Sequence, residues 1–534
     1  MRYTRYLLII SSSCAFCAVL AAFFIPMGAA VLPVFSSGLP ETAFRSIRSA
    51  AIFTIVQAFL SAAGASCIGL CAAFFCARRN FFGRKSLLAL SAIPLSVPPV
   101  VIALAFILFF GKNGLLNRFL AQFSAGRVSI GTFLYSMGGV LLVHSFYNFP
   151  ITMRTVAAAW EKLPEETEQA ACLLGASPLH IFKTIIFPAL KAPFFASFVI
   201  IFLYCFFSFV IILLLGGLGV TTLEVELYQT IRREVHTQAA AWIALLETLI
   251  ASAAVGLYAY LRSRTADHTD NAQYLRPRTP LCGKREKLIF YCLGCIIVGC
   301  LILPLLSLLA YSFSTIGGAA QQNLPLHTGL KTWQQLIQHP DFWNALKNTV
   351  QIGFGTATVS VLAALLFAAI SVFSRLHWLK SLPFLPFTVS SIVIGSGWLR
   401  LDTAPSPFLL IAAQSSLAWP FAWAQIEVSL AKIPHSVLDA AFLLSASRTE
   451  AFFRTVLPLC KTGIVSAFCC VFAISAGDAS LPILLHIPNF ENLALMLFRF
   501  AGSYHFTESA GIAVILALLT GFLFFVQDTM REAV

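Results

Sequence analysis

The spacing of long apolar runs constrains the fold of this chain more than any other feature. A helix needs about 20 apolar residues to cross a bilayer, and runs of that order recur along the whole sequence. Twelve are expected to span a membrane: residues 6–25, 50–76, 87–110, 132–152, 194–215, 238–261, 288–311, 345–373, 382–401, 407–430, 464–485 and 509–526. The pattern predicts an all-α polytopic membrane protein.

The composition agrees with this prediction and excludes an ordinary soluble domain. Of the 534 residues, 59% are hydrophobic and 11% are charged, whereas soluble domains are about one half apolar and one quarter charged. The net charge of +13 could indicate nucleic-acid binding. The lysines and arginines, however, concentrate in the segments on one side of the expected spans, which is typical of the cytoplasmic side of a membrane protein. We therefore expect no nucleic-acid partner, and both termini in the cytoplasm.

A polar segment occurs twice at a constant offset of 270 residues, in residues 165–193 and again in residues 436–463. The pairs of identical residues are Ala170/Ala440, Ala171/Ala441, Leu173/Leu443, Leu174/Leu444, Ala176/Ala446, Ser177/Ser447, Phe182/Phe452 and Pro188/Pro458, with Lys162/Lys432 and Pro164/Pro434 just upstream. The repeat predicts two pseudo-symmetric halves, residues 1–261 and 288–534, that are joined by a cytoplasmic linker, residues 262–287.

The residues of the first copy predict two short helices separated by a turn. Pro164 suits the first position of a helix, and Glu165 is favourably placed at the positive end of the helix dipole. Gly175 can adopt the positive φ that ends such a helix. Ser177 can then cap a second helix that has Pro178 at its first position.

The second copy retains this turn although Ser445 replaces the glycine. Ser447 and Glu450 are three residues apart, which is the spacing of a capping box at a helix N-terminus. The same helix-turn-helix is therefore expected in both halves.

Both copies resemble the EAA loop of ABC importer permeases, which reads E-A-A, three residues, Gly, nine residues, I-x-L-P. The spacing is intact in each copy, and the departures from the pattern include Gln169 for Glu (beside Glu168), Phe187 for Leu, Ser445 for Gly and Thr455 for Ile. The positions that carry the motif are Glu168, Gln169, Ala170, Ala171, Gly175 and Pro188 in the first EAA loop (residues 164–188), and Asp439, Ala440, Ala441, Ser445 and Pro458 in the second (residues 434–458).

The resemblance implies a fold, partners and a location. In this family the EAA loop is the coupling helix that docks into a separate ATPase subunit. The chain would then have the type I permease fold, with two copies of the ATPase, a solute-binding protein and membrane lipid as partners. It would lie in the inner membrane of a bacterium and would hydrolyse no ATP itself.

Three further segments resemble the fused, two-half permeases of thiamine and iron(III) importers. They are Ser475-Ala476-Gly477-Asp478, Gly216-Gly217 followed by residues 221–229 (TTLEVELYQ), and residues 499–504 (RFAGSY). The resemblance implies thiamine or its phosphates as the substrate, with iron(III) as the alternative.

Few charged residues lie inside the expected spans, and an intramembrane charge is a functional candidate by default. They are Glu247, Glu427 and Asp478. Glu427 is expected near the headgroups, either snorkelling or in a salt bridge. For Asp478 two interpretations remain open: it satisfies backbone amides freed by a helix break at Gly477, or Gly477 and Asp478 form a gate or contact the substrate.

Two other classes of protein were weighed. A secondary active transporter with a 6+6 repeat would need no ATPase, but the three acids make a sparse proton relay. A membrane enzyme lacks a catalytic constellation, since the sequence has no P-loop, HExxH or nucleophile-elbow motif. The pairs Cys14/Cys17 and Cys292/Cys295 lie in apolar runs without histidine or acidic partners, so neither a metal nor a cofactor is expected.

Overall fold

Helices account for nearly all regular structure in the computed structural model, which describes residues 2–35, 38, 41–84, 87–88, 91, 96–124, 131–216, 221–266, 278–281, 283–314, 329–373, 377–445 and 448–532. Within these ranges the exception is a parallel pair of two-residue strands, β1 (Arg79–Asn80) and β2 (Thr279–Pro280). The expected all-α fold is confirmed. Ser447 of the expected capping box, Gly217, and residues 267–277 and 282 of the linker lie outside the described residues.

The first part of the chain forms long helices interrupted by short ones. In order they are α1 (Arg2–Val31), α2 (Glu41–Arg78), α5 (Pro99–Phe110), α6 (Leu115–Ser124), α7 (Met137–Glu161), α8 (Glu165–Leu173), α9 (Pro178–Ile181), α10 (Phe187–Phe206), α11 (Val210–Leu215), α12 (Leu223–Arg233) and α13 (Gln238–Ala266). A π-helical turn, η3 (Phe182–Ile186), joins α9 to α10, and the 3-10 turns are η1 (Leu32–Phe35) and η2 (Phe133–Tyr135).

The second part repeats this order. Its helices are α14 (Lys284–Ile297), α15 (Leu303–Ser312), α16 (Lys331–Gln338), α17 (Phe342–Phe373), α18 (Ser391–Arg400), α19 (Pro407–Leu430), α20 (His435–Leu444), α21 (Arg448–Ala451), α22 (Leu457–Leu459), α23 (Lys461–Gly477), α24 (Ser480–Leu485), α25 (Leu493–Gly502) and α26 (Phe506–Glu532). The π-helical turns are η4 (Val298–Ile302) and η6 (Phe452–Val456), and η5 (His377–Thr388) is a 3-10 segment.

Among the described residues, eight helices are long and apolar enough to cross a membrane, or ten if each of two bent pairs is one span. Helices α7 and α19, at the expected fourth and tenth spans, are not among them. They contain 25 and 24 residues, which is about 36 Å at 1.5 Å per residue and longer than the hydrocarbon core. Buried polar side chains such as His144 and Gln414 lower their hydropathy. The expected number of twelve spans therefore stays a prediction.

The first helix of each half packs on the other half. Helix α1 lies against α17, α18 and α19, and α15 lies against α5. The contact of α1 with α18 is close because Gly397 has no side chain, and a Cβ there would lie 1.8 Å from the carbonyl oxygen of Pro26. Because the first helix of each half packs on the other half, the two halves are interlocked in space. The domain boundaries at residues 261 and 288 therefore remain predictions from the sequence repeat.

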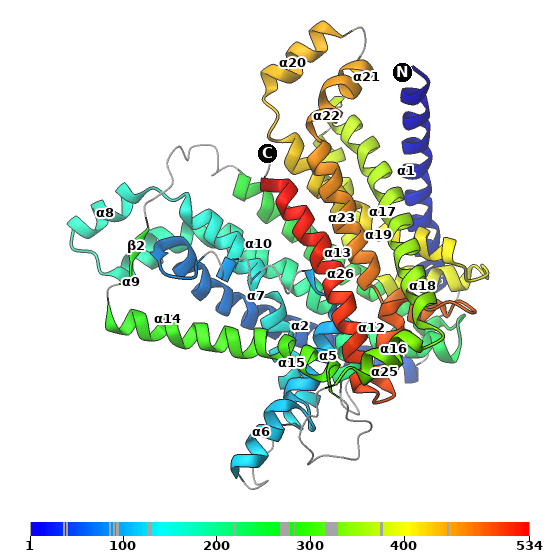
Figure 1. The fold of residues 1–534 in the computed structure, drawn as a ribbon. Helices are drawn as coiled ribbons and strands as arrows, with labels where there is room; N and C mark the ends of the chain where they lie inside the picture. The colour runs from blue at the N-terminus through cyan, green and yellow to red at the C-terminus, as the bar shows by residue number, and fades with distance from the viewer. Residues whose placement is uncertain are drawn as a thin grey trace.

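The remaining helices pack in the same way in both halves. Helix α2 packs against α7 and α10, and α17 packs against α19 and α23. The Leu223 amide donates a hydrogen bond to Thr54 Oγ1 at 2.9 Å, and the Leu493 amide donates one to Thr349 Oγ1 at 2.8 Å. In Figure 1 the two groups of helices diverge, with α8 at the end of one group and α20 at the end of the other.

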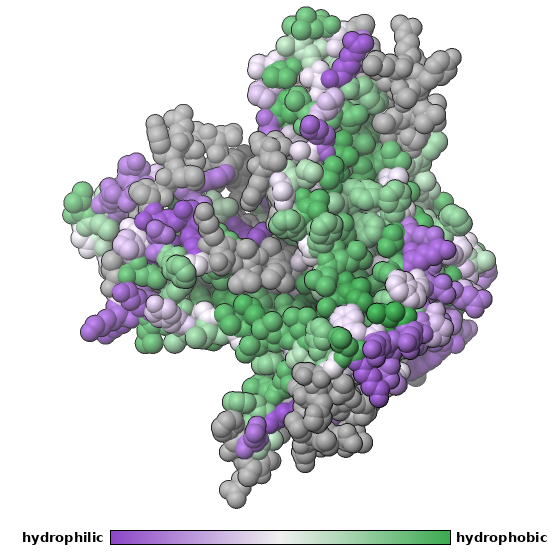
Figure 2. Space-filling view, viewed as in Figure 1, coloured by the Kyte–Doolittle hydropathy of each residue, from purple (hydrophilic) through white to green (hydrophobic). Residues whose placement is uncertain are grey.

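Polar and apolar residues occupy different parts of the molecular surface. Figure 2 shows an apolar surface over the middle of the molecule, with hydrophilic residues gathered around α16 and α25 and again near α8. Both chain ends lie toward α20, whereas α6, α16 and α25 lie at the opposite end (Figure 1). An apolar middle with polar ends is the surface that a bilayer requires.

Candidate functional site

The first EAA loop forms α8 and α9, and a glycine turn separates them. Pro164 is the N-cap of α8, one position earlier than expected, and acidic residues occupy the first turn. Gly175 has a φ of +81°. The Gly175 and Ala176 amides donate hydrogen bonds to the carbonyls of Cys172 and Ala171, each at 3.0 Å. These two bonds make a Schellman cap, so the expected role of Gly175 in ending α8 is confirmed.

The start of α9 also follows the sequence prediction. Ser177 is the N-cap, and its Oγ accepts a hydrogen bond from the His180 amide at 3.3 Å. Pro178 occupies the first position of α9, where a missing N–H costs nothing.

The second EAA loop reaches a similar shape by a different turn. Pro434 is the N-cap of α20, and the helix ends at Leu444. Ser445 has φ −97° and ψ 145°, an extended conformation that any residue can adopt. This explains why serine replaces glycine in the second copy.

Four leucines at matched positions project from the tips of the two loops. Leu173 and Leu174 are 90% and 88% exposed, and Leu443 and Leu444 are 86% and 88% exposed. The repeat shows that these leucines are identical in the two copies, but no motif position marks them as site residues. Of the selected residues, the structure exposes Gln169, Ala170, Gly175, Pro188, Asp439, Ala440 and Pro458, partly buries Glu168, Ala171 and Ser445, and buries Ala441.

Each EAA loop continues into a membrane helix through a π-helical turn at a matched position, η3 and η6. Pro188 and Pro458 follow these turns as the second residue of α10 and of α22. A proline removes one helical hydrogen bond and crowds the preceding turn, and a wider turn accommodates it. The first loop is thus continuous with α10, whereas the second reaches α23 through α22 and a bend of 61°.

Ionic contacts hold the first EAA loop to the first half. Arg78, at the end of α2, forms an ion pair with Glu168 of α8. The guanidinium of Arg78 also lies 5.8 Å from the ring centroid of Trp160, within range of a cation–π contact. Glu168 is therefore an anchor of α8 and not an exposed contact residue.

The C-terminal end of the linker contacts the first half close to α8. Arg278 pairs with Glu161 at 2.9 Å, and Arg84 pairs with the same carboxylate at 2.9 Å. Arg79 of β1 pairs with Glu286, and the backbone of β1 lies parallel to β2. The junction of the two halves is thus tied to the base of α8.

A cavity of about 720 Å³ lies between the two halves. On α7 its lining runs from His144 to Thr155, and on α10 and its C-cap from Ala196 to Phe207. Thr155 is nearer than His144 to the end of α7 that leads into the first EAA loop, and Ala196 is likewise nearer the start of α10. On α7, the lining therefore extends from His144 toward the EAA loop.

Two polar groups at matched positions line this cavity. In the first half, His144 Nε2 lies 2.9 Å from Ser208 Oγ, and His144 Nδ1 lies 2.7 Å from the amide nitrogen of Gln57. In the second half, Gln414 Nε2 donates to Asp478 Oδ2 at 3.0 Å. His144 and Gln414 differ by 270 in residue number, as do Ser208 and Asp478. The repeat thus places a polar pair at the same depth in each half.

The helix break at Gly477 has the geometry that one of the two interpretations predicts. Helix α23 ends at Gly477, and Asp478 Oδ1 accepts a hydrogen bond from the Ser480 amide at 2.9 Å. The Asp478 side chain also lines the cavity, which the other interpretation requires. Gly477 packs against Pro98 across the boundary between the halves, since a Cβ there would lie 2.6 Å from Pro98 Cγ.

The other two acids in the spans lie outside this cavity. Glu247 appears isolated in the sequence but is buried beside Glu224 and Ser390. Glu427 pairs with Arg262 at 3.4 Å and is half exposed, as expected for a residue near the headgroups. In the described parts of the chain, no group of three or more His, Cys, Asp or Glu side chains is placed to hold a metal ion.

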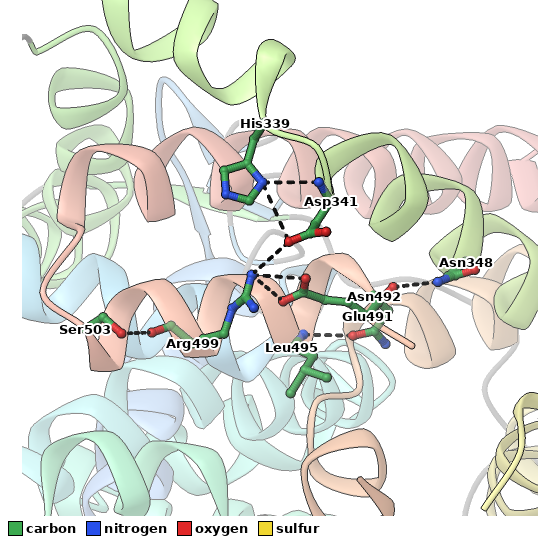
Figure 3. Close-up of polar contacts among 8 residues, drawn as sticks. All are labelled: His339, Asp341, Asn348, Glu491, Asn492, Leu495, Arg499 and Ser503. Atoms are coloured by element: carbon green, nitrogen blue, oxygen red, sulfur yellow. Dashed lines mark hydrogen bonds and ion pairs between the residues drawn. The ribbon is translucent and has the colours of Figure 1, made fainter. Parts of the chain in front are cut away.

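At the end opposite the EAA loops, α25 carries a charged cluster (Figure 3). Arg499 pairs with Glu491 at 3.1 Å and with Asp341 at 3.7 Å. Asn492 caps α25 through a 2.8 Å hydrogen bond from the Leu495 amide. Burial raises the pKa of the Glu491 carboxyl, Asp341 adds to the rise, and the Arg499 guanidinium opposes it.

Comparison with known proteins agrees with this architecture. Residues 65–267 match the family described as binding-protein-dependent transport system inner membrane component. A thiamine transport system permease protein of Escherichia coli (strain K12) is 29% identical over 505 residues, which cover 90% of this chain and 88% of that protein. One from Brucella abortus (strain 2308) is 26% identical over 471 residues, or 85% of this chain and 82% of the relative. A putative 2-aminoethylphosphonate transport system permease protein of Salmonella typhi is 31% identical over 212 residues, or 40% of this chain and 73% of the relative.

Proposed function

The chain belongs to the family of inner membrane components of binding-protein-dependent transport systems, and on that premise we propose that it is the translocation subunit of an importer for thiamine or its phosphates. A separate ATPase supplies the energy, and a separate binding protein delivers the substrate. The relatives that extend over most of the chain are named as thiamine transport permeases, which supports the choice of substrate.

The main structural support for this proposal comes from the two EAA loops. Each presents a pair of leucines that are at least 86% exposed, at matched positions on α8 and α20. Exposed apolar side chains grouped at a projecting tip are typical of a protein contact. We assign the loops, with Gln169, Ala170, Asp439 and Ala440 on their outer faces, as docking sites for two copies of the ATPase, one on each loop.

The proposed mechanism is alternating access. Gly477 and Pro98 both line the cavity and pack against each other across the two halves, and we assign this contact as the closure on the side opposite the EAA loops. Closure of the two ATPases would draw the α8 and α20 tips together. That movement would pass through η3 and η6 into α10 and α23, and rigid-body rotation of the helix groups would open the outer side.

The location of the two faces follows from the same proposal. The EAA loops, both termini and the linker face the cytoplasm, in agreement with the lysine and arginine bias of that side. The charged cluster of Arg499, Glu491 and Asp341 faces outward, where the binding protein would dock.

Co-purification with the ATPase tests the proposal. The tagged chain, extracted in mild detergent from its native cells, should carry two ATPase copies. Leu173→Asp or Leu443→Asp should each lower the recovered ATPase from two copies toward one, and the double variant should reduce it by tenfold or more, because a charge would have to be buried in each apolar contact. Leu330→Asp, a matched control at an exposed leucine on the opposite end, should leave recovery unchanged. Equal recovery from all of these variants would contradict docking on the loops.

A further inference from the structure

We propose that the central cavity is itself a recognition site for a small organic cation, in which the Asp478 carboxylate is the charge partner and the rings of Tyr147, Tyr204 and Tyr258 form an aromatic wall. This inference rests on the proposed transport function, because it assigns a charge class to the substrate that crosses the cavity. It places part of the substrate selection in the membrane subunit as well as in the binding protein.

The first argument for a cation site is the charge of the side chains that line the cavity. Among the described residues that line it, Asp478 is the one acidic side chain, and none is lysine or arginine. The Asp478 carboxylate accepts hydrogen bonds from the Gln414 side chain at 3.0 Å and from the Ser480 amide at 2.9 Å, and the Leu481 amide and the Ser480 hydroxyl also donate to it. All of these donors are neutral, so they orient the carboxylate without cancelling its charge. In a site enclosed by apolar helices, an uncompensated charge attracts a cation strongly.

The second argument for a cation site is the presence of aromatic side chains in the cavity wall. Tyr204 of α10 is 41% exposed although it lies within the helix bundle, and the surface that it exposes lines the cavity. Tyr147 on α7 and Tyr258 on α13 line the same cavity. Aromatic faces attract delocalised organic cations through their negative quadrupole.

The third argument is that the tyrosines and Asp478 lie in different halves of the protein. The three tyrosines come from the first half, and Asp478 comes from the second. A cation held between them would contact both groups of helices, whose relative rotation would open and close the path. The cavity volume of about 720 Å³ lies within the range of small-molecule pockets, about 300–1,000 Å³. The same carboxylate would repel a phosphate or phosphonate group, so the cavity favours thiamine itself over its phosphate esters.

Equilibrium dialysis of the purified permease–ATPase complex tests this inference. The probes are radiolabelled thiamine, its uncharged 3-deaza analogue, and thiamine monophosphate. We expect the wild-type complex to bind thiamine roughly tenfold more tightly than the uncharged analogue, since a contact to a charged group has that magnitude. Asp478→Asn should bring the ratio close to one, and Asp478→Glu should restore part of it.

Two further variants keep the test decisive if Asp478→Asn does not fold. Tyr204→Leu should weaken thiamine binding at least threefold and change binding of the uncharged analogue less. Glu427→Gln removes an acid that lies outside the cavity and should behave as wild type. Equal binding of thiamine and the uncharged analogue to the wild type, no effect of Asp478→Asn, or no binding of any probe would each overturn the inference.

The same preparations separate this inference from the proposed function. ATPase recovery, and stimulation of ATP hydrolysis by the loaded binding protein, report on the importer. If both are normal while the probes are not distinguished by charge, the cation site is wrong and the importer stands. If no ATPase assembles, the importer is wrong, and dialysis of the chain alone still reports on the cavity.

Discussion

Replacing Gly175 by alanine isolates the backbone strain at the end of α8. The residue has a φ of +81°, and no atom lies within 4 Å of an added Cβ, so alanine would not clash with its surroundings. An L-residue in the left-handed conformation costs about 1–2 kcal/mol relative to glycine. At the lower value, the population in which the Schellman cap is open would rise about fivefold.

Hydrogen exchange of a peptide that spans residues 165–177 measures this change. The Gly175 and Ala176 amides, which donate the two bonds of the cap, should exchange about fivefold faster in the Gly175→Ala variant. Ser445→Ala is the matched control in the second loop, where φ is −97° and alanine is unstrained, so its exchange should not change. Equal effects at both positions, or none at Gly175, would refute the assignment of different turns to the two loops.

Three other glycines give further predictions. Gly397→Ala would force a Cβ to within 1.8 Å of the Pro26 carbonyl and should destabilise the contact of α1 with α18 by about 1–3 kcal/mol, seen as a lower melting temperature. Gly256→Ala has open space around the new Cβ and should melt within about 2 °C of wild type, so equal melting of both variants would contradict the packing. Gly477→Val would meet Pro98 at 2.6 Å and should reduce transport at least tenfold while ATPase recovery stays normal; unchanged transport would remove this contact from the path.

The EAA loops were predictable because their signals are local. Gly175, Ser177 and Pro178 each act on the two or three residues beside them, and the structure places them where capping rules require. The second loop was predictable in position but not in its turn. A serine carries no local signal for an extended φ and ψ, and the sequence alone could not distinguish it from a distorted glycine-type turn.

The exchange of first helices was not predictable from the sequence. Helix α1 contacts residues that are more than 300 positions away, such as the contact of Pro26 with Gly397. Neither residue has a pattern that identifies its partner, because the contact depends on the packing of whole helices. The hydropathy of α7 and α19 is also lower than that of the other long helices, because they carry polar side chains such as His144 and Gln414 that face the interior.

The matched polar pairs in the cavity were within reach of the sequence but not recognised. The offset of 270 that aligns the EAA loops also aligns His144 with Gln414 and Ser208 with Asp478. Because the residue types differ between the halves, a comparison of identical residues does not reveal these pairs. The structure shows that the two pairs correspond, because a hydrogen bond joins the two members of each pair.

Uptake into proteoliposomes tests the central claim most directly. The chain would be reconstituted with its co-purified ATPase, and thiamine would be supplied outside with the binding protein. We predict uptake that requires ATP on the EAA-loop side, requires the binding protein, and is insensitive to proton or sodium gradients. Uptake by the chain alone, driven by such a gradient and independent of ATP, would contradict the account and establish a secondary carrier.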